Sequence, residues 1–134
     1  MKYLDELKRL DFPIDKFAIF GSGPLAIRGL REIDDLDIIV KSDLWNVLRK
    51  KYPVRNEKIE YIKIGNIEIY KEWSPWFDDI NQLIDEADII DGFRFVKLER
   101  VLEWKKVFNR EKDKKDIELI NNYLDSIKKS SDRF

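Results

Sequence analysis

Two reactive residue types are missing from this chain, which contains no cysteine and no histidine. Without cysteine, disulfide bonds, thiolate catalysis and cysteine-bound zinc are excluded. Without histidine, imidazole bases and imidazole metal ligands are excluded as well. Any chemistry must therefore depend on carboxylates, lysines, arginines, serines and tyrosines.

Long apolar runs are missing too. No stretch approaches the roughly 20 apolar residues that a helix needs to cross a bilayer, and residues 1–12 carry charges throughout, unlike a secretion signal. The 26 basic and 27 acidic residues almost cancel, so the chain as a whole does not attract nucleic acid or anionic lipid. These features predict a cytoplasmic protein with no membrane contact, whose binding to any polynucleotide would need a local patch.

The residues that are present suit one folded domain. With 134 residues, 43% of them hydrophobic, the chain can bury a modest core. Apolar spacing predicts helices over 2–10, 24–30, 42–51 and 78 or 79 to 87, strands over 17–20, 35–40, 58–64, 67–73 and 93–98, and two helices in the last third. We expect an α/β fold with a mixed, mainly antiparallel sheet flanked by helices and a C-terminal helical hairpin. A single domain would span 1–134, with a core at 1–91 and the final strand and hairpin at 92–134.

The most informative stretch is 17–40, FAIFGSGPLAIRGLREIDDLDIIV. A strand and a glycine turn at Gly21 and Ser22 lead through a short helix to a second strand. Because successive strand side chains point to opposite faces, Asp35 and Asp37 project to the same side. Neighbouring carboxylates repel unless a cation or proton lies between them, and Mg²⁺ is typically held by one or two carboxylates plus phosphate oxygens. A phosphate chain could therefore lie between the turn and a metal ion on the two aspartates.

Each half of this pattern has an ordinary reading by itself, since glycine turns are common and Asp-x-Asp is more often a solvated strand face. Together, the halves resemble the nucleotidyltransferase superfamily related to DNA polymerase beta, whose signature is Gly-Ser, a helix, then Asp-hydrophobic-Asp. Those residues stand here as Gly21-Ser22 and Asp35-Leu36-Asp37. The resemblance implies that Asp35 and Asp37 are catalytic ligands of Mg²⁺ or Mn²⁺, and that Gly21 and Ser22 bind a nucleoside triphosphate.

The residues between these two motifs agree with the family at one point and depart from it at another. Gly29-Leu30-Arg31 fits the glycine and arginine that precede the acidic pair, which implies nucleotide binding by Arg31. Many members place Ser or Thr two residues before the first aspartate, where this chain has Ile33.

A third carboxylate is expected from the hairpin around Gly65-Asn66, where turn residues separate two alternating apolar runs. In the resembled family an acid from such a strand joins the pair, activating the attacking hydroxyl or binding a second cation. The resemblance implies that Glu68 is this catalytic residue and metal ligand. Glu60 and Glu72 compete with it, because the sequence does not fix the strand register, and an isolated glutamate on an edge strand is usually solvated.

Residues 73–77, WSPWF, form an aromatic-rich turn. Such rings can stack on a nucleic-acid base. More often they close the end of a sheet, and packing is the interpretation that we favour here.

The segment 98–120, LERVLEWKKVFNREKDKKDIELI, resembles the C-terminal helices of small, toxin-like members of the same superfamily. Their pattern is a lysine on the first helix, Arg-x-Lys-Asp, then Asp-hydrophobic, and the matching residues are Lys105, Arg110, Lys112, Asp113 and Asp116. The resemblance implies that Lys105 and Arg110 neutralise triphosphate oxygens. The alternative is a solvated helical hairpin in which Lys112 and Asp116 form an i,i+4 pair.

The resulting hypothesis is metal-assisted transfer of a nucleoside monophosphate from a nucleoside triphosphate to a hydroxyl on a protein, an RNA or a small molecule. Ile33 and the open choice of third carboxylate favour a second hypothesis, an inactive module of this fold that binds a nucleotide or a partner protein. The C-terminal resemblance suggests a third, a toxin of the toxin–antitoxin kind that modifies transfer RNA. Small members of the superfamily often pair with a helical partner protein.

Overall fold

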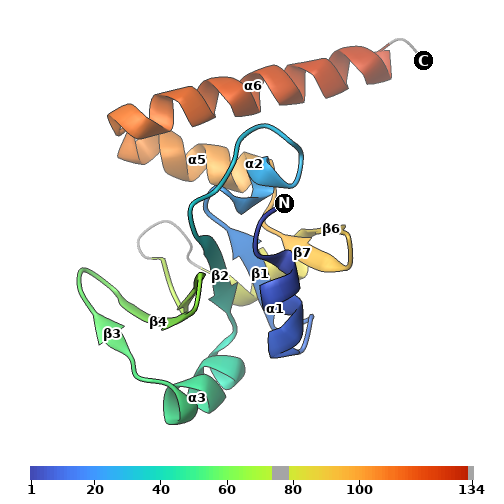
Figure 1. Ribbon diagram of the computed structural model, residues 1–134. Coiled ribbons are helices and arrows are strands. Elements are labelled where there is room, and N and C mark those ends of the chain that lie inside the picture. Colours follow the sequence, from blue (N-terminus) through green and yellow to red (C-terminus); the bar gives the residue numbers. More distant parts are fainter. Residues whose placement is uncertain (74–78, 133–134) are drawn as a thin grey trace. The chain divides into compact units, whose positions relative to one another are not determined.

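The computed structural model describes residues 1–73 and 79–132, and the chain divides into two compact units, Met1–Lys97 and Leu98–Phe134. In the described part, the first unit contains, in order, α1 (Leu4–Leu10), β1 (Phe17–Phe20), α2 (Gly23–Ala26), β2 (Leu36–Val40), α3 (Ser42–Lys51), β3 (Arg55–Asn56), β4 (Glu60–Ile64), β5 (Ile67–Tyr70), α4 (Ile80–Asp85), β6 (Asp88–Ile90) and β7 (Phe93–Phe95) (Figure 1). The second unit contains α5 (Leu98–Phe108) and α6 (Glu111–Asp132).

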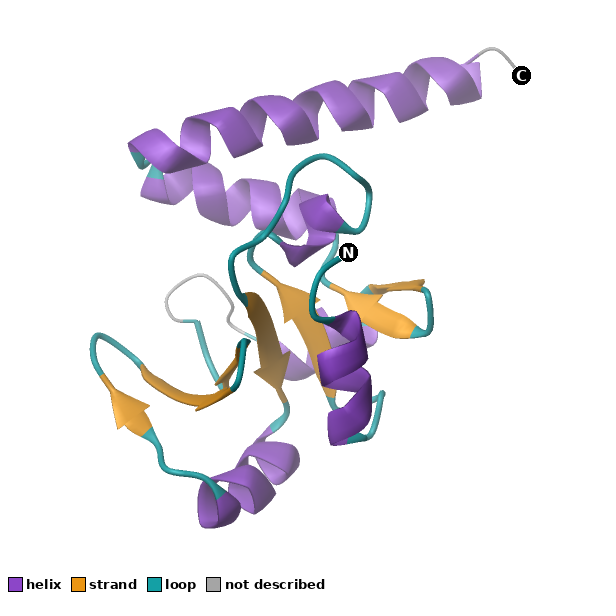
Figure 2. Ribbon diagram, in the orientation of Figure 1, coloured by secondary structure: helices purple, strands orange, loops and turns teal. Residues whose placement is uncertain are grey.

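The strands of the first unit form one sheet with the order β3-β4-β5-β2-β1-β7-β6. The pairs β1–β2, β3–β4, β4–β5 and β6–β7 are antiparallel, whereas β2–β5 and β1–β7 are parallel (Figure 2). The mixed, mainly antiparallel α/β fold expected from the sequence is therefore confirmed.

One face of this sheet carries the hydrophobic core. Strand alternation places apolar side chains of β1, β2 and β5 on this face, and α1 and α3 cover it with Leu7, Leu44, Trp45 and Leu48. The buried strand residues of this core are Phe17, Ile19, Leu36, Ile38, Val40, Ile62, Ile67, Ile69 and Phe95. Ile33, which replaces the Ser or Thr of many resembled proteins, is 3% exposed in the same core. Packing therefore accounts for an apolar residue at that position.

The opposite face is apolar at one end and polar at the other. Helix α4 packs against β2, and its Leu83 and Ile84 are buried. The helix is capped by Asp79, whose carboxylate accepts a hydrogen bond from the Gln82 backbone N–H at 3.0 Å, as an N-cap residue should. Asp37, on the same strand, lies on the polar part of this face and begins the candidate site.

The β4–β5 turn is held by two other segments of the first unit. Glu6 on α1 accepts hydrogen bonds from the backbone N–H of Asn66 at 2.9 Å and from its side-chain amide at 3.1 Å. The backbone hydrogen bond is the main cause that lowers the Glu6 pKa. The Leu36 N–H, at the start of β2, donates to the Asn66 carbonyl at 3.0 Å. The expected hairpin around Gly65 is confirmed, and its turn connects α1 with β2.

Several element boundaries differ from the expectation. Helix α2 is a single turn that ends at Ala26, and Gly29 adopts a φ of 74° in the loop that follows. Helix α3 begins at Ser42, and its N-cap is Lys41. Strand β6 was not expected. Of the aromatic turn at 73–77, only Trp73 belongs to the described residues, and 74–78 lie outside them.

The second unit consists of two helices that pack side by side, with α6 running back along α5 (Figure 1). Asn109, in the turn between them, has a φ of 47°, a left-handed conformation that asparagine tolerates at helix ends. The strand expected at 93–98 ends at Phe95 and belongs to the first unit. The single domain expected over 1–134 stays a prediction. Among the described residues, none of the helices combines the length and the apolar character needed to cross a bilayer.

Candidate functional site

The centre of the candidate site is a pair of acids on adjacent parallel strands. Asp37 on β2 is the register partner of Glu68 on β5, and neighbouring strands lie about 4.8 Å apart with paired side chains on the same face. Glu60 instead pairs with Asn56 on the outer strand β3, and Glu72 follows the end of β5. The register thus brings Glu68, rather than its two competitors, beside Asp37.

Gly21 lies directly against the Asp37 carboxylate. Its φ is 66°, and a Cβ atom added to it would lie 2.9 Å from Oδ2 of Asp37. Both the backbone conformation and the close approach therefore require glycine. Ser22 follows as the half-buried N-cap of the one-turn helix α2, without a side-chain capping bond. The expected approach of the glycine turn to the acids is present at Gly21.

Asp35 lies outside the strand that was expected to contain it. Strand β2 begins at Leu36, so Asp35 is an exposed residue in the bend before the strand. Within 1–73 and 79–132, no three acidic side chains converge closely enough to hold a metal ion by themselves. Asp37 and Glu68 are the two acids that the register brings together, and Asp35 is not part of this pairing.

An aromatic group borders these acids, and sequence reasoning did not assign it a role. The Tyr70 hydroxyl donates to Oε2 of Glu68 at 3.1 Å. Burial raises the pKa of Tyr70, and the charges of Asp37 and Glu68 raise it further. The Tyr70 ring contacts the rings of Phe20 and Trp73, with centroid distances of 5.6 Å and 5.0 Å. The signal available in the sequence was the two-residue spacing, which predicts that Glu68 and Tyr70 share a face.

A basic residue lies on the other side of Glu68. Lys63 on β4 is the antiparallel register partner of Glu68, and its side chain is exposed. Across this part of the sheet the register therefore runs from Lys63 through Glu68 to Asp37. The site combines two acids with one cation at its rim, which is the charge pattern suited to a metal-bound anion.

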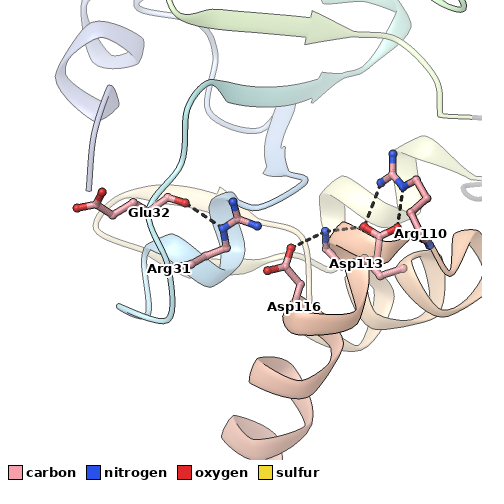
Figure 3. A network of polar contacts seen from close by, with 6 residues as sticks. Arg31, Glu32, Arg110, Asp113 and Asp116 are labelled. Carbon is pink, nitrogen blue, oxygen red and sulfur yellow. Dashed lines mark hydrogen bonds and ion pairs between the residues drawn. The ribbon is translucent and has the colours of Figure 1, made fainter.

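Arg31 stands in the loop between α2 and β2. The side chain is exposed, and its Nε donates to the Glu32 carbonyl at 2.9 Å (Figure 3). Arg31 lines a cavity of about 490 Å³ together with Lys2 and Gly29. Glu32 lines it too, so the charged residues of its wall are two cations and one acid.

Lys105 and Arg110 belong to the second unit, where they form a network with two buried aspartates. Lys105 Nζ lies 3.0 Å from Oδ2 of Asp116 and 3.6 Å from Oδ1 of Asp113. Arg110 donates to both Asp113 oxygens, at 2.7 Å and 3.1 Å (Figure 3). Its guanidinium also lies over the Phe108 ring at 4.9 Å. The sequence pattern named both aspartates, but it did not predict their burial or their pairing with Lys105 and Arg110, because aspartates in a charged helix normally face solvent.

The charges of this network are balanced at short range. Burial raises the pKa of Asp113, but the hydrogen bond from Arg110 and the charge of Lys105 outweigh burial, so the pKa is below its ordinary value. Asp113 also accepts a hydrogen bond from the Arg110 backbone N–H at 3.2 Å, which caps the start of α6. A structural role therefore accounts for Arg110 and Asp113 of the Arg-x-Lys-Asp pattern, whereas Lys112 is exposed. No protein-family model, curated protein or solved structure matches the chain.

Proposed function

We propose that this protein is a nucleotidyltransferase that moves a nucleoside monophosphate from a nucleoside triphosphate to a hydroxyl acceptor. The observation that carries the proposal is the pairing of Asp37 with Glu68, with Gly21 against the Asp37 carboxylate. Two acids held side by side need a cation or proton between them. Gly21 lets the turn approach the Asp37 carboxylate closely, which sets the turn beside the acids.

The donor atoms fit a hard divalent cation such as Mg²⁺ or Mn²⁺. Asp37 and Glu68 offer carboxylate oxygens from adjacent strands, and Mg²⁺ usually combines one or two carboxylates with phosphate oxygens of the substrate. Asp35, exposed two residues before Asp37, is the further carboxylate that the resemblance implies as a metal ligand. When bound, the ion would withdraw negative charge from the phosphates of the substrate.

The residues of the chain would act on both reacting groups. Glu68 accepts the proton of the acceptor hydroxyl as that oxygen forms its bond to the α-phosphorus. The bond between the α-phosphorus and the bridging oxygen breaks, and pyrophosphate leaves with the electron pair. The backbone at Gly21 and Ser22 lies along the phosphates. The cations Lys63 and Arg31 offset the charge of the triphosphate.

The test is release of pyrophosphate from labelled nucleoside triphosphates, with RNA, protein and small hydroxyl compounds offered as acceptors. Asp37→Asn and Glu68→Gln should each lower the rate by about 100-fold or more, since each removes a group that acts on the reacting atoms. Glu60→Gln is the matched control, because this acid lies on the neighbouring strand and pairs with Lys71 at 3.4 Å. Equal rates in Asp37→Asn and Glu60→Gln would contradict the proposal.

A second candidate is a module of the same fold that binds a nucleotide or a partner protein without turnover. Ile33 favours it, because the buried apolar side chain replaces a hydroxyl found in many resembled enzymes. Calorimetry with the Mg²⁺ complexes of ATP and CTP tests this candidate. Binding that is lost in Asp37→Asn, without pyrophosphate release against any acceptor, would support the module. Labelled acceptor would exclude it.

A further inference from the structure

We propose that Tyr70 is a positioning residue that fixes the carboxylate of Glu68 beside Asp37. The catalytic part of this inference rests on the proposed function, whereas the contact itself does not. Glutamate has a long side chain with considerable rotamer freedom, and ordering it costs conformational entropy. A base that must meet an acceptor proton works only when its oxygens are held in place. The Tyr70 hydroxyl, which donates a hydrogen bond to Glu68, can hold the carboxylate in place.

The hydrogen bond between Tyr70 and Glu68 joins residues on one face of one strand. The phenol oxygen lies 3.1 Å from Oε2 of Glu68. In the part of the chain that the structure describes, Oε1 of Glu68 accepts no hydrogen bond. Asp37 is the register partner of Glu68, so the two acids share a face of the sheet. The Tyr70 hydroxyl therefore holds one Glu68 oxygen on the face that carries Asp37.

The Tyr70 ring is itself held rigidly. Its side chain is 7% exposed, and it meets Phe20 edge to face at a centroid distance of 5.6 Å. Trp73 contacts it at 5.0 Å, and Tyr61 stacks on it at 5.6 Å. A tyrosine has only two side-chain torsions, and packing on three sides fixes both. The hydroxyl therefore has a defined position from which it can orient a flexible acid.

Tyr61 provides a matched control within the same aromatic group. Its ring stacks on Tyr70, but its hydroxyl donates to Glu57 at 3.1 Å instead of to Glu68. Tyr61→Phe and Tyr70→Phe therefore each remove one phenol hydrogen bond to a glutamate. Only the second change affects the acid beside Asp37. General effects on packing should be similar in the two variants.

The kinetic test measures kcat and KM for the triphosphate. Tyr70→Phe should lower kcat about tenfold, the effect of losing one hydrogen bond to a charged group, with KM changed less than about twofold because ground-state binding is not affected. Tyr61→Phe should leave both constants unchanged. Adding Tyr70→Phe to Glu68→Asp, which withdraws the carboxylate from the phenol, should lower kcat no further. A full additional loss would show that Tyr70 does not act through Glu68 and would overturn the inference.

A second measurement does not depend on turnover. The carboxyl ¹³C resonance of Glu68, identified by its absence in Glu68→Gln, should shift in Tyr70→Phe and stay in place in Tyr61→Phe. No shift, or an unchanged kcat in Tyr70→Phe, would overturn the positioning role. If the resonance shifts but the wild-type protein transfers no nucleotide, Tyr70 still fixes Glu68, and it is the proposed function that fails.

Discussion

Replacing Lys105 by methionine should destabilise the protein because it removes the central cation of a buried network. Only 4% of the Lys105 side chain is exposed, and its partners Asp113 and Asp116 are 1% and 4% exposed. Methionine fills a similar volume but carries no charge. Arg110 still binds Asp113 in the variant, so the loss falls mainly on the 3.0 Å pair with Asp116.

The expected magnitude is large for a single substitution. Removing one partner of a buried ion pair costs about 3–5 kcal/mol, because the remaining charge stays in a poorly solvated place. Lys106→Met is the control, since the next residue on α5 is exposed and surface changes usually alter stability by less than about 0.5 kcal/mol. Urea unfolding followed by circular dichroism gives both free energies of unfolding at pH 7.

The same network predicts how the difference in the free energy of unfolding between the wild type and Lys105→Met depends on pH. The pKa of Asp113 is lower in the folded protein than its ordinary value of 3.8. Its contribution to stability is therefore fully present above pH 3.8 and is lost as the pH falls through the folded value. The charge of Lys105 causes part of this lowering, so the gap in stability between the wild type and Lys105→Met should narrow below pH 3.8, and the gap for Lys106→Met should not change.

Two outcomes would refute this reasoning. If Lys105→Met is as stable as Lys106→Met at pH 7, the buried network does not stabilise the second unit. If that stable variant has also lost binding of the Mg²⁺ complex of a triphosphate, Lys105 is the nucleotide ligand that the sequence resemblance implies.

Two further substitutions test the first unit. Gly21→Ala and Gly92→Ala both place alanine at a positive φ, 66° and 83° respectively, at a cost of about 1–2 kcal/mol each. Of these two positions, only Gly21 has a neighbour close to the new Cβ, which would lie 2.9 Å from Oδ2 of Asp37. Gly21→Ala should therefore be the less stable variant in urea and should lose pyrophosphate release, and equal stabilities would contradict the close approach. Asp79→Ala should cost about 1 kcal/mol by removing the N-cap bond of α4. The exposed Asn81→Ala in the same helix should cost less, and the opposite order would show that the cap is not stabilising.

Local patterns in the sequence predicted much of the first unit. The apolar run at Phe17–Phe20 became β1 with the expected bounds, and Gly65-Asn66 lies in the turn between β4 and β5. Strand alternation also predicted that Glu68 and Tyr70 share a face. These features depend on neighbours within a few residues, so the sequence alone contains the information.

Features that depend on distant residues were not predictable. The parallel pairing of β2 with β5 joins segments about 30 residues apart, and this pairing decides which glutamate meets Asp37. In the second unit, the spacing of Asp113 and Asp116 looks like that of surface residues, and only the packing of α5 on α6 brings Lys105 to them. The superfamily resemblance and the catalytic and nucleotide-binding roles stay predictions.

The contact of Glu6 with Asn66 links α1 to the two strands that carry Asp37 and Glu68. The Asn66 carbonyl also accepts a hydrogen bond from the Leu36 N–H, one residue before Asp37. Strand β5 begins at Ile67, directly after Asn66. These hydrogen bonds fix the position at which the pairing of β2 with β5 begins. If β5 slipped by a single residue relative to β2, every side chain of β5 would move to the opposite face of the sheet. Glu68 would then no longer share a face with Asp37. An amino-terminal glutamate thus helps to set the alignment on which the pairing of the two acids depends.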